Sequence, residues 1–359
     1  MTATLHRRAD PVATDRRRGG PRTPKVRRPA VGLAAWFGVL VATAAVLVVD
    51  RFHRLPVHVA PAAAGALGVT LVLGLVVRTG GRPLLPVVLA TGYAAGAALS
   101  LQPLLLGGAA VGVGAAAAVL AVMGTVPAVR FRQAIREVVL GCVLATVAGL
   151  AVAAFGRAAG VAVDRFTYLV LAAALLGCFA LVYRLGAGFH GLGRRGYAVA
   201  AGATLLLAIA LAYSEAVGRW GTPALVNGLD DLRVFVRDHA GAVPHPIETL
   251  LGVPALCWGT FMRARRRQGW WVCAFGIALT APVAYALVDP GRSVREVSLA
   301  TGYGAVLGLV IGFVLIRIDL RLSGRRSVRG RRQAEIDEVT ALRPEPGRTH
   351  ALGWTRSPR

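Results

Sequence analysis

Long apolar blocks, separated by short polar segments, run along most of the chain. The blocks are rich in Ala, Val, Leu and Gly and lack the polar face that core helices of soluble proteins carry. A helix needs about 20 apolar residues to cross the hydrocarbon layer of a bilayer. The blocks therefore predict an all-α, polytopic bundle of about ten transmembrane helices, placed at 30–49, 59–77, 84–105, 108–128, 137–155, 166–184, 197–216, 246–262, 270–288 and 297–316.

The eighth expected span, 246–262, is the weakest of these blocks. Its continuous apolar run starts only at Thr249, so it reaches spanning length only if the helix begins near Pro246. Proline suits the first position of a helix, and Glu248 would then lie in the first turn, where the helix dipole favours an acidic side chain. We expect a helix that starts at this proline.

Basic residues are distributed unequally between the two sets of loops that these spans define. Loops rich in Lys and Arg stay in the cytoplasm. With the amino terminus inside, the inside segments carry the whole net charge of +24, and the outside segments hold as many acidic as basic residues. We therefore expect a multi-pass protein of the cell membrane with both termini in the cytoplasm.

A net charge of +24 would by itself suit a nucleic-acid-binding protein. The basic residues lie between and outside the apolar blocks, however, so no basic domain is large enough for recognition and no nucleic-acid partner is expected. We expect a disordered basic tail at 1–29, the membrane domain at 30–316, and a mostly disordered basic tail at 317–359 with a short helix at 333–342. Arginine clusters in these tails suit anionic lipid headgroups.

One outer segment, 218–245, is long enough to hold structure of its own. Asn227 is a good helix N-cap and Gly241 a good stop. Between them, apolar residues fall on one side at helical spacing and charged residues fall elsewhere. The pattern predicts a short amphipathic helix on the outer membrane surface, which either only connects the seventh and eighth spans or carries a site.

This outer segment also holds the candidates for catalysis. Arg233 and Arg237 are one helical turn apart, so both guanidinium groups can hold one phosphate or pyrophosphate. His239 and His245 supply groups for acid–base chemistry, as do Asp238 and Glu248. The alternative is a solvated loop whose charges form surface ion pairs. No spacing typical of a metal or cofactor site is present, so none is expected.

Polar side chains are sparse inside the expected spans, and no Asp, Glu, Lys, Arg or His lies near the middle of any of them. Such residues usually mark proton relays and coupling sites, so their scarcity argues against a proton-driven pump. The uncharged polar residues offer a substrate path through the third, ninth and tenth spans, with Tyr93, Gln102 and Tyr303 as candidates.

Small residues at helical spacing indicate how the spans pack. Such glycines occur in the third, fourth and tenth spans: Gly92 and Gly96, Gly108 and Gly112, and Gly304, Gly308 and Gly312. In lipid they let helix backbones approach closely, so we expect them in the bundle interior or at an oligomer contact. The four cysteines all fall inside apolar blocks without a paired motif, so we expect small buried hydrophobic side chains rather than disulfides.

Three hypotheses follow for the function. The first is transport or translocation of a small or lipid-linked substrate, based on the many spans, the short loops and the polar path. The second is a membrane enzyme that acts at the outer leaflet on a lipid-linked phosphate or glycan through Arg233, Arg237, His239 and His245. The third is a structural partner of a membrane complex, which the basic tails would suit.

Overall fold

The computed structural model describes residues 28–341, apart from residues 54, 161, 186–192, 266–268 and 290. All secondary structure in this part of the chain is helical, as the sequence predicts. The tail at 1–27 and residues 342–359, for which we expect disorder, lie outside the described residues.

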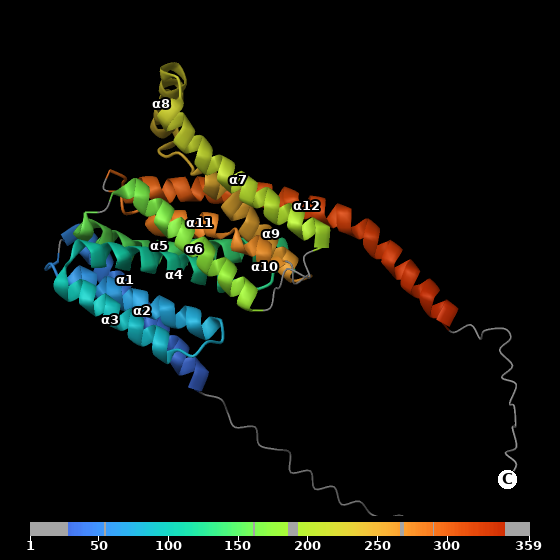
Figure 1. Cartoon of the computed structure of the whole chain (residues 1–359), viewed down its shortest axis with the longest axis horizontal. Helices are drawn as coiled ribbons and strands as arrows, with labels where there is room; N and C mark the ends of the chain where they lie inside the picture. The colour runs from blue at the N-terminus through green and yellow to red at the C-terminus, as the bar shows by residue number, and fades with distance from the viewer. Residues whose placement is uncertain are drawn as a thin grey trace, which may run out of the picture.

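The helices follow one another along the chain as a bundle with one outlying element (Figure 1). Their bounds are α1 (Arg28–His53), α2 (Val59–Arg78), α3 (Leu84–Ser100), α4 (Pro103–Met123), α5 (Phe131–Ala159), α6 (Val163–Arg184), α7 (Gly193–Trp220), α8 (Pro223–Ala240), the π-helical turn η2 (Glu248–Gly252), α9 (Val253–Arg263), α10 (Gly269–Ala274), α11 (Ile277–Tyr285) and α12 (Val294–Ala341).

Among the described residues, six helices are long and apolar enough to cross a membrane: Gly32–His53, Val59–Arg78, Pro103–Met123, Phe131–Ala159, Arg165–Arg184 and Val294–Leu322. Shorter apolar helices occupy Leu84–Ser100, Ala200–Tyr213 and Gly269–Tyr285. The all-helical architecture is confirmed, and six such helices indicate a multi-pass membrane protein. The expected number of about ten crossings stays a prediction, because interrupted helices form the eighth and ninth expected spans.

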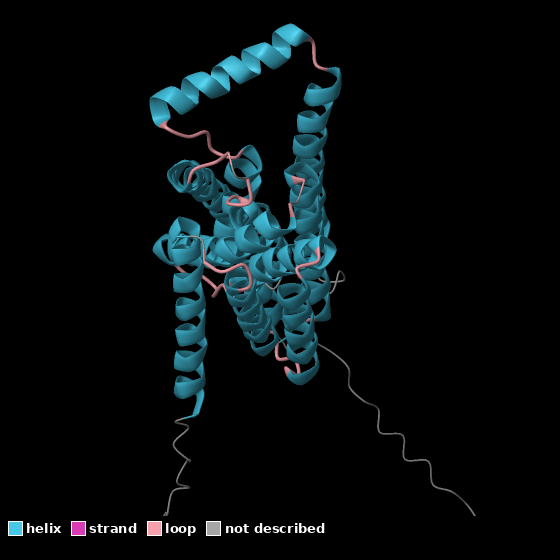
Figure 2. Cartoon of the chain, turned by 90° about the vertical axis from the view of Figure 1, so that its left-hand side faces the viewer, coloured by secondary structure: helices cyan, strands magenta, loops and turns pink. Residues whose placement is uncertain are grey.

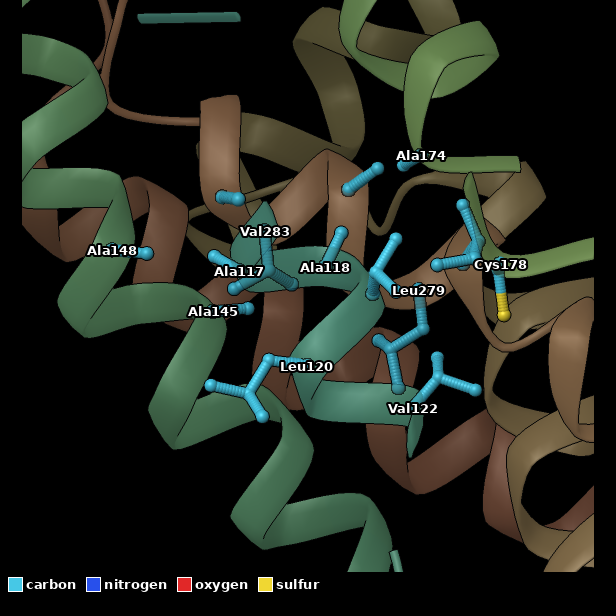
Figure 3. Close-up of a cluster of buried hydrophobic side chains, with 14 of the residues drawn as sticks. Ala117, Ala118, Leu120, Val122, Ala145, Ala148, Ala174, Cys178, Leu279 and Val283 are labelled. Carbon is cyan, nitrogen blue, oxygen red and sulfur yellow. The ribbon is translucent and has the colours of Figure 1, made fainter. Parts of the chain in front are cut away.

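Helix α4 lies at the centre of the bundle and packs against α2, α5, α6 and α11. Its buried side chains are mostly Ala, Val and Leu, which let the helices approach closely (Figure 3). One polar contact joins the apolar surfaces: the Thr280 hydroxyl on α11 donates to the Ala118 carbonyl on α4 at 3.1 Å. The core thus depends on small residues and few hydrogen bonds. This is expected in a membrane, where the hydrophobic effect does not drive helices together and close packing holds them instead.

The glycines of the tenth expected span lie inside the bundle, as predicted. A Cβ on Gly308 would lie 2.5 Å from the Cβ of Val253, and one on Gly312 would lie 3.0 Å from the Cβ of Cys257. These glycines therefore let α12 lie directly against α9. Gly92, Gly96 and Gly112 differ, because a Cβ on any of them would have no neighbour within 4 Å in the described part of the chain, whereas Gly108 lies against the Tyr93 side chain.

Helix α8 is the outlying element (Figure 2). Its expected end is confirmed, because Gly241 adopts a left-handed conformation with φ of 77°. The expected start at Asn227 is wrong: the helix begins at Pro223, with Thr222 at the N-cap. Proline at the first helical position fixes the backbone angle that a helix needs, and this signal outweighs Asn227. No described side chain of α8 is buried.

Helix α12 is longer than the tenth expected span. It continues without a break from Val294 to Ala341, far beyond the apolar window that ends at Leu322. The short helix expected at 333–342 is therefore, as far as the chain is described, the last part of α12.

Candidate functional site

The chain re-enters the bundle after α8. Gly241 turns the backbone, Ala242 is buried, and the next helix begins at Pro246, where the sequence predicts a start. This loop lies beside α12, since the Tyr303 hydroxyl donates to the Ala240 carbonyl at 2.9 Å and Gly241 lies against Leu299. We call residues 241–252 the re-entrant segment.

The re-entrant segment reaches well below the end of the bundle. A Cβ on Gly304 would lie 3.7 Å from the carboxyl carbon of Glu248, and Gly304 is roughly three turns into α12. Irregular backbone at this depth in a membrane protein occurs only where protein buries it or where it lines a water-filled cavity. The helix that follows runs from Pro246 through η2 and α9 to Arg263.

Proline explains why this helix starts with a π-helical turn. Pro254 has no backbone N–H, so it cannot donate to the carbonyl four residues earlier, and its ring crowds that carbonyl. The Val253 N–H bonds instead to the Glu248 carbonyl, five residues back. Such π-helical turns inside α-helices are frequent at functional sites. Here the turn widens the helix at the position of Glu248.

The partner helix is interrupted as well. Helices α10 and α11 form one antiparallel arm against η2 and α9, broken at Phe275–Gly276, with Pro282 inside α11. The two arms approach closely at Gly252, where a Cβ would lie 2.5 Å from the carbonyl carbon of Ala278. Two interrupted helices thus meet next to Glu248.

Glu248 is the most unusual side chain of this region. It is 3 % exposed, and its Oε1 atom has no hydrogen-bond partner in the described part of the chain. Most buried polar atoms have a partner, because an unsatisfied one costs about 1–3 kcal/mol, and more when it is charged. The sequence places Glu248 in the first turn of a helix and among the groups that could serve acid–base chemistry. The structure places it inside the bundle, in the first turn of the helix that starts at Pro246.

His245 precedes Glu248 by three residues and shares its environment. The Nδ1 atom of its ring is buried and has no partner among the described residues, whereas its backbone carbonyl accepts from the Thr249 N–H and hydroxyl, both at 3.0 Å. Burial, together with the positive charges of Arg292 and Arg233, lowers the pKa of His245. The imidazole is therefore neutral near pH 7, and this loop presents two buried polar groups without partners.

Ionic contacts join α8 to the start of α12 above these groups. The Glu296 carboxylate accepts a hydrogen bond from Arg237 of α8, and its Oε1 lies 3.7 Å from the Nε of Arg292. One carboxylate thus holds two guanidinium groups. Neither Arg292 nor Glu296 was a candidate from the sequence, because only the return of the chain after α8 brings them to this place.

The structure separates the four candidates for catalysis. Arg233 pairs with Asp230 on α8 at 3.2 Å, Arg237 pairs with Glu296, and His239 Nδ1 lies 2.8 Å from the Phe235 carbonyl. These three lie on the exposed helix α8, and His245 alone lies in the re-entrant segment. The ion pairs of Arg233 and Arg237 match the alternative of surface pairing.

The three candidates for the substrate path lie in two different parts of the bundle. Tyr303 lies on α12 and bonds to Ala240 at the re-entrant segment. Tyr93 lies on α3 against Gly108 of α4, and Gln102 is the exposed N-cap residue of α4. Helix α3 packs against α2 and α4, whereas α12 packs against η2, α9 and α5. Tyr303 therefore belongs to the Glu248 region, and Tyr93 and Gln102 belong to another part of the bundle.

A second polar cluster lies at the opposite end of α9. Arg263 donates to the Thr125 hydroxyl at 2.7 Å and to its carbonyl at 3.1 Å, and its guanidinium lies 3.3 Å from the ring centroid of Trp270. Arg78 also donates to the Thr125 carbonyl, at 3.2 Å. Glu137 accepts from the Val126 N–H at 2.8 Å. This cluster satisfies the backbone between α4 and α5, so its role is to hold the helices together.

The arrangement around Glu248 can bind a cationic species or a polar group at depth, because it offers a buried carboxyl oxygen and a neutral imidazole without partners. Comparison of the chain with protein-family models, with curated proteins and with solved structures finds no match.

Proposed function

We propose that this chain is a membrane transport or translocation protein for a small or lipid-linked substrate, and that the re-entrant segment forms the outer part of the substrate path. The observation that carries the proposal is the buried carboxyl of Glu248, which has an oxygen without a partner where two interrupted helices meet. Intramembrane ionisable residues mark substrate and ion pathways in membrane proteins.

The interrupted helices support the same proposal. Transporters bind substrates near the middle of the bilayer at discontinuous helices, whose freed backbone groups and helix ends contact the substrate. Here η2–α9 and α10–α11 are both interrupted, and both pack against α5 beside α12. A scaffold protein that only needs a stable bundle gains nothing from a π-helical turn and a buried unpartnered carboxyl, since both cost stability.

The path that we propose starts at the ionic contacts between α8 and α12. It passes the Arg237–Glu296–Arg292 group and His245, and it ends at Glu248, with Tyr303 and Gly304 of α12 along one wall. On this proposal, the ionic group and the Tyr303 hydrogen bond hold the path closed. Opening it requires α8 and the re-entrant segment to move away from α12.

The test measures whether position 249 meets water, by reaction of substituted cysteines with a charged thiol reagent that does not cross membranes. The four native cysteines, all free, are first replaced by alanine. Thr249→Cys places a thiol on the buried side of the re-entrant segment, and the matched control Leu250→Cys places it one residue on, at a position 53 % exposed on the outer surface of the bundle. A lipid-facing thiol is not ionised and is not reached by the reagent.

A transport protein should react at position 249 from both sides of the membrane, in right-side-out and in inverted vesicles, because its path opens alternately to each side. Position 250 should stay unreactive in both. An enzyme of the outer leaflet would react at position 249 from one side only, and a structural protein from neither. Either of these two results overturns the transport proposal.

A further inference from the structure

We infer that Glu248 is a proton-binding site that couples proton uptake to substrate movement, and that His245 relays the proton between the outer solution and the Glu248 carboxylate. This inference rests on the proposed function, since it names the coupling ion of the same site. It is carried by two polar groups that have no partner in the described part of the chain, the Oε1 atom of Glu248 and the Nδ1 atom of His245.

Charge at Glu248 is poorly compensated. Arg292 is the cationic group that acts on it, and the Nε atom of this guanidinium also lies 3.7 Å from Glu296. The other groups that feel its charge are neutral at pH 7, namely Cys142 of α5 and Tyr285 of α11. A buried carboxylate with so little compensation carries a high desolvation cost, and a proton removes the charge at once.

A proton suits this site better than a metal ion. Arg292 acts on the Glu248 carboxyl, and its positive charge opposes every bound cation, a proton included, so the choice between ions depends on the number of ligands that each ion needs. Hard cations such as Na⁺ or Ca²⁺ also need several oxygen ligands, whereas a proton forms one O–H bond. Movement of Arg292 with the start of α12 would change the charge next to Glu248, and with it the affinity for the proton.

His245 is placed to act as the relay. It precedes Glu248 by three residues in the segment that returns from α8, its Nδ1 atom is buried, and its imidazole is neutral near pH 7. A neutral imidazole accepts a proton on one nitrogen and releases one from the other, so it ends the transfer neutral and in the other tautomer, and a turn of the ring restores the first tautomer. Hydronium in the outer water loses a proton to one imidazole nitrogen, the other nitrogen releases its own proton, and that proton forms the O–H bond of the Glu248 carboxylic acid.

Infrared difference spectroscopy of the purified full chain in lipid nanodiscs tests this inference without a known substrate. A protonated carboxylic acid has a C=O stretching band that the carboxylate lacks. Wild type should show this band at low pH and lose it as the pH rises. The other carboxyl groups also absorb here when they are protonated, so the Glu248 band is the component of this transition that Glu248→Gln loses. Glu137→Gln is the matched control, because Glu137 is also buried, 5 % exposed, but accepts a hydrogen bond from Val126; its spectra should keep the transition.

Two further measurements test the relay and the identity of the ion. His245→Gln should slow proton exchange at Glu248 by about a hundredfold, the scale of a lost acid–base group, and should leave the carboxylic acid band itself in place. Addition of Na⁺ at constant pH should not change the band. A Glu248 band that disappears with Na⁺ assigns the site to a metal ion and overturns the inference, as does a spectrum of Glu248→Gln that is identical to that of wild type at every pH.

The inference and the proposed function fail separately. A titrating Glu248 combined with an unreactive Thr249→Cys would mean a buried acid outside any path, which overturns the coupling and the transport proposal together. A reactive Thr249→Cys on both sides with no Glu248 transition would leave the path in place and overturn proton coupling alone.

Discussion

Gly252 offers the sharpest test of how closely the two interrupted helices pack. Changing it to alanine adds a Cβ at 2.5 Å from the carbonyl carbon of Ala278 and 2.7 Å from the Cα of Leu279. Both are backbone atoms, so no side chain can rotate away. Carbon atoms prefer a separation of about 3.5–4.0 Å, so the arms must move apart by about 1 Å.

The expected loss follows from two opposing effects. Overpacking costs about 1–3 kcal/mol, and a fixed backbone neighbour places this site at the upper end of that range. Alanine regains about 1 kcal/mol relative to glycine in a helix. The net destabilisation of Gly252→Ala is therefore about 2 kcal/mol, a large part of the roughly 5–15 kcal/mol that holds a typical domain folded.

Thermal unfolding of the purified chain in detergent measures this loss. We expect the unfolding temperature of Gly252→Ala to fall clearly below that of wild type. The control is Gly96→Ala on α3, where an added Cβ has no neighbour within 4 Å among the described residues, so its unfolding temperature should be unchanged or slightly higher. Equal unfolding temperatures for wild type and Gly252→Ala would refute the close packing of the two arms.

Two other predictions concern the opposite end of α9 and the orientation of the chain. Arg263→Ala removes two hydrogen bonds to Thr125, so the free energy of unfolding should fall by about 2–3 kcal/mol and the unfolding temperature should fall with it. Arg132 is exposed, so Arg132→Ala should have little effect. Equal losses in the two variants would show that the Arg263 contacts contribute nothing to stability. In the chain without native cysteines, Val226→Cys should react with an impermeant thiol reagent from outside intact cells, and Ala264→Cys should react only after lysis. The reverse pattern would invert the expected topology.

The sequence predicts the helices well because the apolar blocks are long. A uniformly apolar segment in a membrane folds as a helix, because a helix satisfies the hydrogen-bonding groups of its own backbone. The start at Pro246 and the end at Gly241 were also predictable, because proline and glycine act through their own backbone geometry. The start of α8 at Pro223 was missed because two helix-start signals, Pro223 and Asn227, lie close together in the sequence.

The site was harder to predict, because it depends on contacts between distant segments. Glu248 fits the first turn of a helix equally well at a surface and inside a bundle, and only the depth of the loop before it decides which. The pairing of Arg237 with Glu296 joins residues that are far apart in the sequence. No local pattern encodes either feature.

Helix α12 is one continuous helix that reaches from the Glu248 region to a point beyond the bundle. One end touches the re-entrant segment through Tyr303 and Gly304, and the same unbroken helix continues about 30 Å past the apolar window that ends at Leu322, at a rise of about 1.5 Å per residue. A small tilt of its first turns therefore swings the far end through a larger arc. A molecule that holds the far end would resist that swing, and opening at Glu248 would then depend on what is bound outside the bilayer.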